Sequence, residues 1–179
     1  MSTDFLIVGG GIAGVSAAAR LSHLGQVVLL EAEDHLAYHT SGRSAALYEP
    51  NYGLAPVVAL SRASGDHLRT TGVLSARGML MVASPDETAV FEADCAALGL
   101  EEITAGAARE MVPILDPERL DRAAYGAHAE DIDTDLLIQS FAREAKANGA
   151  RIVTGARVTA IARTGGRWRA DTKKDSFEG

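Results

Sequence analysis

Cysteine is almost absent from the sequence, since Cys95 is the single one among 179 residues. A lone cysteine excludes a disulfide within the chain and fits a reducing compartment. Cys95 lies in an alanine-rich stretch with a helical pattern. We therefore expect it to be a small buried hydrophobic residue and not a reactive thiol.

Long hydrophobic runs are also missing. No stretch of about 18 apolar residues occurs, so no transmembrane segment is expected. The residues before the first apolar run, Met1 to Asp4, are too few for the charged region and cleavage site of a signal peptide. We expect a cytoplasmic protein, and an association with a membrane surface stays open.

Basic residues are too few for a nucleic-acid partner. The 17 lysines and arginines face 24 acidic residues, which gives a net charge of −7, whereas nucleic-acid binding needs a basic face. The histidines lack the spacing of metal ligands, so no metal site is expected. No Ser-His-Asp arrangement is evident, and catalytic residues stay unidentified. The histidines are His23, His35, His39, His67 and His128.

The first 31 residues have the pattern of a strand, a helix and a second strand. Residues 5–8 and 27–30 are short apolar runs, typical of parallel strands buried on both faces. Between them, small and apolar residues recur at helical spacing over 12–24. Gly25 follows, where a left-handed residue often ends a helix. We expect a right-handed βαβ unit.

Gly9-Gly10-Gly11-Ile12-Ala13-Gly14 matches the G-x-G-x-x-G pattern at the junction of this strand and helix. Gly9 permits the sharp turn, Gly11 lets a pyrophosphate approach the backbone, and Gly14 allows the helix to pack closely. The first turn of the helix, which includes Ala13, presents N–H groups to phosphates. The alternative is a glycine-rich turn without a ligand.

Glu31 ends the second strand, where a carboxylate can accept hydrogen bonds from the ribose of an adenine dinucleotide. The same charge repels a 2′-phosphate, which argues against NADP. Ala32 follows at the same edge of the sheet. This fingerprint does not separate FAD from NAD.

The rest of the chain alternates between helical and strand patterns. Residues 32–52 lack periodicity and are expected to form an ordered loop that contacts a ligand. Asp133 or Thr134 caps a late helix, and Gly165-Gly166 joins two strands. Helices are expected over 56–68, 85–98, 108–112 and 133–148, and strands over 78–83, 123–129, 151–154, 157–162 and 167–172.

Three stretches carry a family resemblance: FLIVGGGIAGVSAAARLSHLGQVVLLE, YHTSGRSAALYEPNYG and DIDTDLLIQSFAREAKANGARI. With them the chain resembles the amino-terminal half of the D-amino-acid oxidase-like (DAO) family of FAD-dependent oxidoreductases. Within it, the chain is most similar to bacterial D-amino-acid dehydrogenases of the D-arginine type. The resemblance implies an α/β fold, with a Rossmann-like FAD-binding domain and β-meander over 1–50 and 132–179. It also implies part of an α+β substrate domain over 51–131.

The resemblance implies FAD as the cofactor and assigns residues to it. In the family, the segment after the second strand wraps the flavin with backbone N–H and hydroxyl groups. Val158 matches a position whose backbone meets the adenine, although a plain core valine is the alternative. The segment comprises Thr40, Ser41, Gly42, Arg43, Ser44, Ala45, Ala46 and Leu47.

The resemblance also places Tyr52 over the substrate, whereas three positions depart from the D-arginine enzymes. Leu47 replaces a histidine of those enzymes, and Glu49 replaces a threonine. Met79 replaces the glutamate that holds the guanidinium group of the substrate. Met79 cannot accept a charge-assisted hydrogen bond, so we expect a more apolar substrate pocket that does not prefer arginine. Glu49 can meet a basic group, but the simpler interpretation is a solvated loop carboxylate.

The activity implied is oxidation of the C–N bond of a D-amino acid or related amine, by hydride transfer to flavin, to an imine that water hydrolyses. The electron acceptor, oxygen or a quinone-type molecule, stays open. One alternative is an NAD-dependent Rossmann dehydrogenase. Another is a non-catalytic FAD-binding fragment, since family members are about twice as long. Their carboxyl half supplies the arginine that pairs with the substrate carboxylate.

Overall fold

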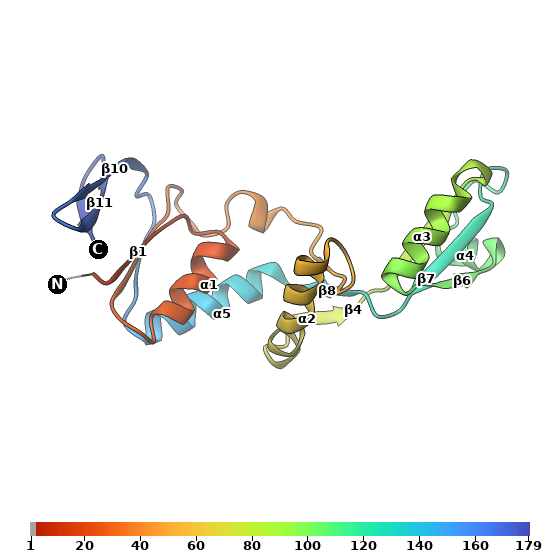
Figure 1. Cartoon of the computed structure of the whole chain (residues 1–179), viewed down its shortest axis with the longest axis horizontal. Helices are drawn as coiled ribbons and strands as arrows, with labels where there is room; N and C mark the ends of the chain where they lie inside the picture. The colour runs from red at the N-terminus through yellow and green to blue at the C-terminus, as the bar shows by residue number, and fades with distance from the viewer. Residues whose placement is uncertain (1–2) are drawn as a thin grey trace. The chain divides into compact units, whose positions relative to one another are not determined.

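The computed structural model describes residues 3–179, apart from the side chain of Thr164. The chain forms two compact units (Figure 1). The first unit comprises Met1–Ala45 and Asp133–Gly179, and the second comprises Ala46–Ile132.

The first unit is built on a parallel sheet with strand order β1-β2-β9. β1 spans Phe5–Val8, β2 spans Val27–Leu30 and β9 spans Arg151–Val153. Helix α1 (Ile12–Leu21) connects β1 to β2, and α5 (Thr134–Ala147) leads into β9. Parallel strands joined through helices confirm the predicted Rossmann-like α/β class.

A β-meander follows the parallel sheet in the same unit. It consists of β10 (Val158–Thr164), β11 (Arg167–Thr172) and β12 (Ser176–Glu178), all antiparallel. Gly165 and Gly166 form the predicted turn between β10 and β11, with φ values of 61° and 84°. Two successive positive φ values match the twist of a tight hairpin, and glycine adopts them without strain.

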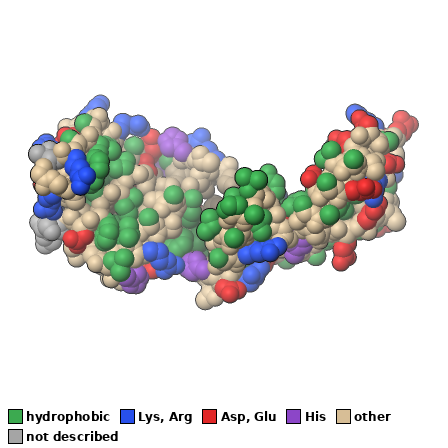
Figure 2. All heavy atoms as spheres, in the orientation of Figure 1, with side chains coloured by type: hydrophobic (Ala, Val, Ile, Leu, Met, Phe, Trp, Pro, Cys, Tyr) green, Lys and Arg blue, Asp and Glu red, His purple; other side chains and the backbone are tan. Residues whose placement is uncertain are grey.

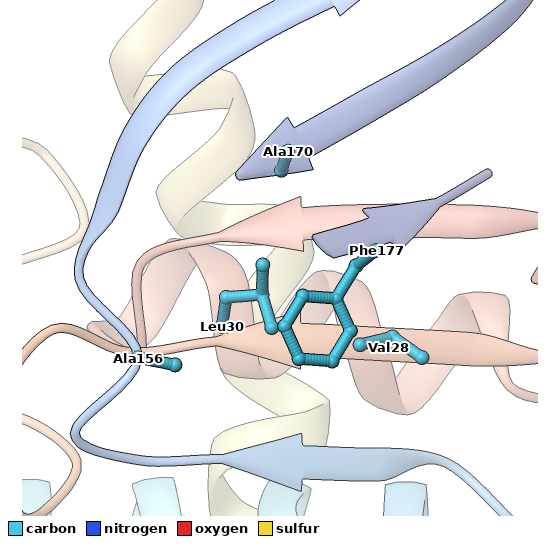
Figure 3. Packing of buried hydrophobic residues seen from close by; sticks show 5 residues of the cluster. All are labelled: Val28, Leu30, Ala156, Ala170 and Phe177. Atoms are coloured by element: carbon cyan, nitrogen blue, oxygen red, sulfur yellow. The ribbon is translucent and has the colours of Figure 1, made fainter. Parts of the chain in front are cut away.

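β2 lies at the centre of the core of this unit, because all four of its residues are buried. Side chains alternate along a strand, so Val28 and Leu30 share one face, where they pack against Phe177 of the meander (Figure 3). Val27 and Leu29 point to the opposite face, and α1 contacts β2. The sheet is thus enclosed between helices and meander.

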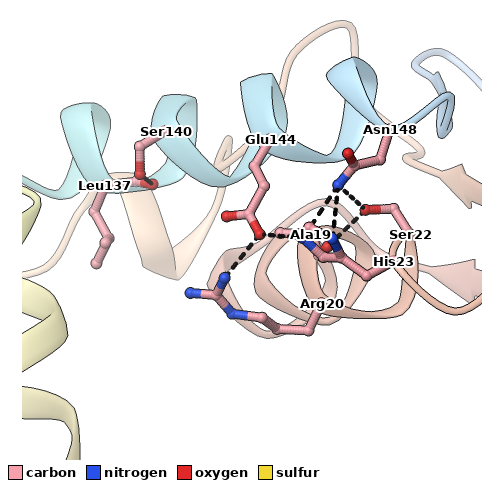
Figure 4. A network of polar contacts seen from close by, with 8 residues as sticks. All are labelled: Ala19, Arg20, Ser22, His23, Leu137, Ser140, Glu144 and Asn148. Carbon is pink, nitrogen blue, oxygen red and sulfur yellow. Dashed lines mark hydrogen bonds and ion pairs between the residues drawn. The ribbon is translucent and has the colours of Figure 1, made fainter.

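Helices α1 and α5 pack side by side and share a polar network on their outer surface (Figure 4). Glu144 of α5 accepts a hydrogen bond from Arg20 at 2.7 Å and contacts Nε2 of His23 at 2.9 Å. The side-chain amide of Asn148 donates to Oγ of Ser22 at 3.1 Å. These contacts fix the ends of the two helices relative to each other.

Two expectations for the βαβ unit are wrong in detail. Helix α1 ends at Leu21, and Gly25 does not adopt a left-handed conformation. Gly25 instead lies against the carboxylate of Asp4, where a Cβ atom would come within 2.6 Å of Oδ2. β1 is not buried on both faces, since its first three residues are only partly buried and Val8 is 52% exposed.

The second unit contains two antiparallel sheets, with strand orders β3-β8-β4 and β5-β7-β6. The first sheet is made of Leu47–Tyr48 (β3), Glu130–Ile132 (β8) and Leu74–Ala76 (β4). The second sheet is made of Met79–Ala83 (β5), Arg122–Gly126 (β7) and Glu101–Ile103 (β6). The strand expected over 123–129 is therefore too long, because the pairing with β5 ends at Gly126 and β8 begins at Glu130.

Helices α2 (Ala55–Thr70), α3 (Thr88–Leu98) and α4 (Ala105–Met111) complete this unit, and the 3-10 turn η2 (Pro85–Glu87) precedes α3. All three helices were predicted, with ends that differ by a few residues. Phe91 of α3 packs against β5 and β7, and Cys95 joins the same cluster as a partly buried residue. No helix among residues 3–179 combines the length and apolar character needed to cross a bilayer.

Candidate functional site

The glycine turn of the first unit connects β1 to α1. Gly9 has a φ of +105°, which side chains disfavour, and its N–H donates to the carbonyl of Leu30 at 2.8 Å. A Cβ atom on Gly14 would collide with the carbonyl oxygen of Gly9. The turn therefore needs glycine at both positions, for backbone conformation at Gly9 and for close packing at Gly14.

The N-terminus of α1 faces this turn without an acidic residue. Gly11 is the N-cap and has no side chain to cap the helix, and the first turn contains no carboxylate. The hydroxyl oxygen of Ser41 accepts a hydrogen bond from the N–H of Ile12 at 3.0 Å. The N–H groups of Ala13 and Gly14 have no acceptor within the helix. Together with the helix dipole they suit a phosphate group.

Glu31 is 8% exposed and directly follows β2. Its Oε2 accepts a hydrogen bond from the N–H of Gly10 at 2.5 Å, and Oε1 accepts one from the N–H of Glu33 at 2.9 Å. Each carboxylate oxygen can accept two hydrogen bonds. One acceptor site on each oxygen therefore remains, which suits the two hydroxyls of a ribose.

Glu33 connects three segments next to Glu31. Its carboxylate contacts Arg157 at 2.9 Å and His39 at 3.2 Å, and its carbonyl accepts the N–H of Gly155 at 2.8 Å. Val158 follows and begins β10, with its side chain packed against the core cluster of the meander. The structure thus gives this side chain a core role, while the adenine contact expected of its backbone stays a prediction.

The predicted flavin loop has more local structure than its sequence pattern suggests. Ala37 donates its N–H to the carbonyl of Gly10 at 3.0 Å, which holds the loop against the glycine turn. A 3-10 turn, η1 (Thr40–Gly42), follows, and the guanidinium of Arg43 lies 5.2 Å from the ring centroid of Tyr38. The residues 42–45 are exposed, and Ala46 and Leu47 belong to the second unit.

The second unit contains a cavity of about 910 Å³ whose lining includes Leu47, Tyr52 and Met79. The structure therefore brings the three predicted substrate residues together. Tyr52 is 70% exposed, and its N–H donates to the carbonyl of Glu49 at 3.2 Å. The walls of the cavity are mostly apolar side chains from α2, β5 and the end of α3.

Glu49 also lines this cavity, and the expectation of a solvated carboxylate is wrong. The residue is 7% exposed, and its Oε1 accepts the N–H of Asn51 at 2.9 Å. Its Oε2 lies 2.7 Å from Nε2 of His128, in a contact without hydrogen-bond geometry.

This buried acid and histidine pair is a feature of the candidate site that the sequence did not predict. His128 lies between β7 and β8, about eighty positions after Glu49, so the pairing of non-neighbouring strands brings them together. The one available signal was the carboxylate itself, in a segment that resembles a substrate loop. Among residues 3–179, no three histidine, cysteine or acidic side chains lie close enough to hold a metal ion.

A parallel βαβ unit, a glycine turn at its first helix and a buried acid after its second strand define a dinucleotide-binding protein of the Rossmann type. The chain matches the family of FAD dependent oxidoreductases, DAO, over residues 4–178. It belongs to this family, and its cofactor is FAD.

Solved structures share the fold. L-proline dehydrogenase from P. horikoshii superposes with a TM-score of 0.81 at 19% identity, over 99% of this chain and 50% of that chain. Glycine oxidase from Geobacillus kaustophilus superposes with a TM-score of 0.81 at 24% identity, over 97% of this chain and 52% of that chain. L-alpha-glycerophosphate oxidase from Mycoplasma pneumoniae, with FAD bound, has a TM-score of 0.80 at 22% identity, over 98% of this chain and 50% of that chain. The chain thus spans about half the length of these proteins.

The residues of the first unit fit the cofactor. The glycine turn has open space beside Gly9, where a Cβ atom would meet no atom within 4 Å, whereas a Cβ atom on Gly11 would come within 3.1 Å of Oγ of Ser41. Glu31 has spare acceptor sites for ribose hydroxyls and would repel a 2′-phosphate. Family membership favours FAD over the nicotinamide alternative that the glycine pattern left open.

Proposed function

We propose that this chain is the FAD-binding half of a longer flavoenzyme that oxidises the C–N bond of an apolar D-amino acid or a related amine. The observation that carries the proposal is the glycine turn with its buried acid, Glu31, in a chain of the FAD dependent oxidoreductase family. When bound, FAD supplies the two-electron acceptor for the hydride from the α-carbon.

We assign the pyrophosphate to the first turn of α1 and the ribose to Glu31. The 40–47 segment is proposed to approach the flavin, because it lies directly after residues held against the glycine turn. Val158 is assigned to the adenine through its backbone. The full proposed set is Gly9, Gly11, Ala13, Gly14, Glu31, Ala32, Thr40, Ser41, Gly42, Arg43, Ser44, Ala45, Ala46, Leu47 and Val158.

An apolar amino acid is the favoured substrate because apolar side chains dominate the walls of the second-unit cavity. Leu47, Tyr52 and Met79 are assigned to the substrate. Proline and glycine appear in the names of two of the structural relatives, which supports an amino acid as the substrate class. The amine chemistry and the D-configuration come from the resemblance of the 38–53 segment to D-amino-acid dehydrogenases.

Two experiments test the proposal. Purified chain mixed with FAD and passed through a desalting column should emerge yellow, with flavin absorbance that follows the protein. Steady-state kinetics on the longer protein should then give a higher kcat/KM for D-leucine and D-phenylalanine than for D-arginine and D-lysine. A colourless chain would contradict the cofactor assignment, and a preference for the basic amino acids would contradict the substrate assignment.

A further inference from the structure

Glu33 lies where three segments assigned to FAD meet. These segments are the end of β2, followed by Glu31, the start of β10 at Val158, and the loop that contains η1. Arg157, which the carboxylate of Glu33 contacts, is 124 positions away in the sequence. Glu33 is therefore placed to control how these segments lie relative to one another.

The backbone of Glu33 holds two of these segments together. Its N–H donates to Oε1 of Glu31 at 2.9 Å, and its carbonyl accepts the N–H of Gly155 at 2.8 Å. The N–H of Ala156 donates to the carbonyl of Glu31 at 2.8 Å. Any residue with a backbone N–H could make the two bonds of position 33. They do not explain why a carboxylate stands there.

The carboxylate of Glu33 adds contacts that depend on its charge. Its Oε1 accepts a hydrogen bond from Nη2 of Arg157 at 2.9 Å and lies 3.2 Å from Nε2 of His39. The side chain of Glu33 is 25% exposed, whereas those of Arg157 and His39 are 64% and 69% exposed. Basic and histidine side chains are visible on the surface of this unit in Figure 2. Exposed ion pairs add little to overall stability, so these contacts act mainly on the position of the segments they join.

His39 extends the contact of Glu33 into the loop. It is the N-cap of η1, and its ring packs edge-on against Tyr38 with 4.9 Å between the ring centroids. The guanidinium of Arg43 lies 5.2 Å from the centroid of the same Tyr38 ring. A continuous series of contacts thus runs from Glu33 to Arg43, which belongs to the segment proposed to approach the flavin.

We propose that Glu33 is a positioning residue of the cofactor site. Through Arg157 it fixes the start of β10 at the adenine end, and through His39 it fixes the loop at the flavin end. The inference rests on the proposed function, which assigns these segments to FAD. A site whose parts are held in place before binding loses less conformational entropy when the ligand binds. Glu33 therefore raises the affinity for FAD without touching it.

Calorimetric titration with FAD and with ADP, which lacks the flavin, separates the two contacts. Arg157→Gln should weaken both ligands by the same factor, about threefold, in keeping with an exposed ion pair. His39→Phe keeps the aromatic ring and removes the nitrogen, so it should weaken FAD about threefold and leave ADP unchanged. Glu33→Gln should weaken FAD about tenfold and ADP about threefold, because it removes both contacts.

The difference between FAD and ADP identifies positioning, since a general loss of folding would weaken both ligands alike. Asp34→Asn is the matched control, because it removes an exposed carboxylate at the next position and should change neither affinity. The double variant Glu33→Gln with Arg157→Gln should bind ADP no more weakly than Glu33→Gln alone, because the pair can be lost only once. Additive losses in the double variant would overturn the proposal.

The same titrations distinguish this proposal from the proposed function. An unmodified chain that binds neither ligand would overturn both. A chain that binds FAD with equal or higher affinity after Glu33→Gln would overturn only the positioning role, as would equal factors for FAD and ADP in that variant. Arg157 and His39 are largely exposed, so their variants give the decisive comparison even where Glu33→Gln does not fold.

Discussion

At the scale of single residues, the glycine turn depends on contacts between backbone atoms that leave no room for adjustment. A Cβ atom on Gly14 would meet the carbonyl oxygen and carbon of Gly9 together with Cγ2 of Ile7. Because two of these atoms belong to the backbone, a change of side-chain rotamer cannot relieve the collision. The turn and the start of α1 would have to move apart.

We therefore expect Gly14→Ala to lower the free energy of unfolding by about 1–3 kcal/mol, the usual cost of overpacking, and to abolish retention of FAD. Gly106→Ala is the control, because its Cβ atom would meet only Oγ1 of Thr104 at 3.7 Å within helix α4. Alanine in a helix should leave that variant equally or more stable. Urea unfolding followed by circular dichroism measures the free energy of unfolding of both variants. An unchanged free energy of unfolding for Gly14→Ala would contradict the packing argument.

Glu31 allows a test of the ribose assignment with little change of shape. Glu31→Gln removes the charge, so FAD should bind about tenfold more weakly, in line with the roughly 1.5–3 kcal/mol of a hydrogen bond to a charged group. Asp34→Asn is the control, because Asp34 is an exposed acid three positions further on. Quenching of flavin fluorescence gives both dissociation constants. Equal affinities in the two variants would remove Glu31 from the cofactor site.

Burial raises the pKa of the Cys95 thiol. A raised pKa means less thiolate at pH 8 than in an unfolded chain, and the thiolate is the reactive form. We expect Ellman's reagent to label the folded chain much more slowly than the chain in urea. The associated stability is present below the ordinary thiol range and declines as the pH rises through it. Equal labelling rates would contradict the partly buried position of Cys95 on α3.

At the scale of elements, local chemistry decides where α5 begins. The side chain of Asp133 accepts the N–H of Leu136 at 2.8 Å, so Asp133 is the cap, and Thr134 is the first helical residue. Asp133→Ala should destabilise the first unit by about 1 kcal/mol. Asp135→Ala is the control, since that carboxylate accepts only the side-chain amide of Gln139, at 3.5 Å, and no described backbone N–H. Thermal unfolding of the two variants measures the difference, and equal decreases in Tm would argue against Asp133 as the cap.

Elements with strong local signals were predictable, and those made by distant pairing were not. The α5 helix has a cap, an apolar face and Gly149 after its end, and β2 is a continuous apolar run. By contrast, β3 and β8 contain two and three residues and exist because they pair with each other across most of the second unit. No periodicity can develop over so few residues.

The site shows the same division. The glycine turn and Glu31 follow a local pattern with a known physical reason, so the sequence was sufficient to single them out. Glu49 is buried and lies against His128, a residue that only the folded second unit brings to it. A loop carboxylate is exposed in most proteins, and the sequence offered no reason to expect otherwise.

At the scale of the whole molecule, the separation into two units has a measurable consequence for ligand binding. A ligand held mainly by the folded first unit stabilises that unit by an amount set by its concentration, about 2.7 kcal/mol at 100 times Kd. Saturating FAD should therefore slow hydrogen exchange in residues 7–33 and leave α3 and β7 of the second unit unchanged. Mass spectrometry resolves these peptides. Protection confined to α3 and β7 would contradict the assignment of FAD to the first unit.

The position of β1 at the side of its sheet has an effect on individual amides. The N–H groups of Phe5 and Gly9 donate to the carbonyls of Gln26 and Leu30 on the β2 side. Because successive residues of a strand direct their N–H groups to opposite sides, the N–H of Ile7 also faces β2. Leu6 and Val8 then direct their N–H groups to the side where no described strand pairs with them. Hydrogen–deuterium exchange along β1 should therefore alternate, slow at the amides that donate toward β2 and fast at those of Leu6 and Val8.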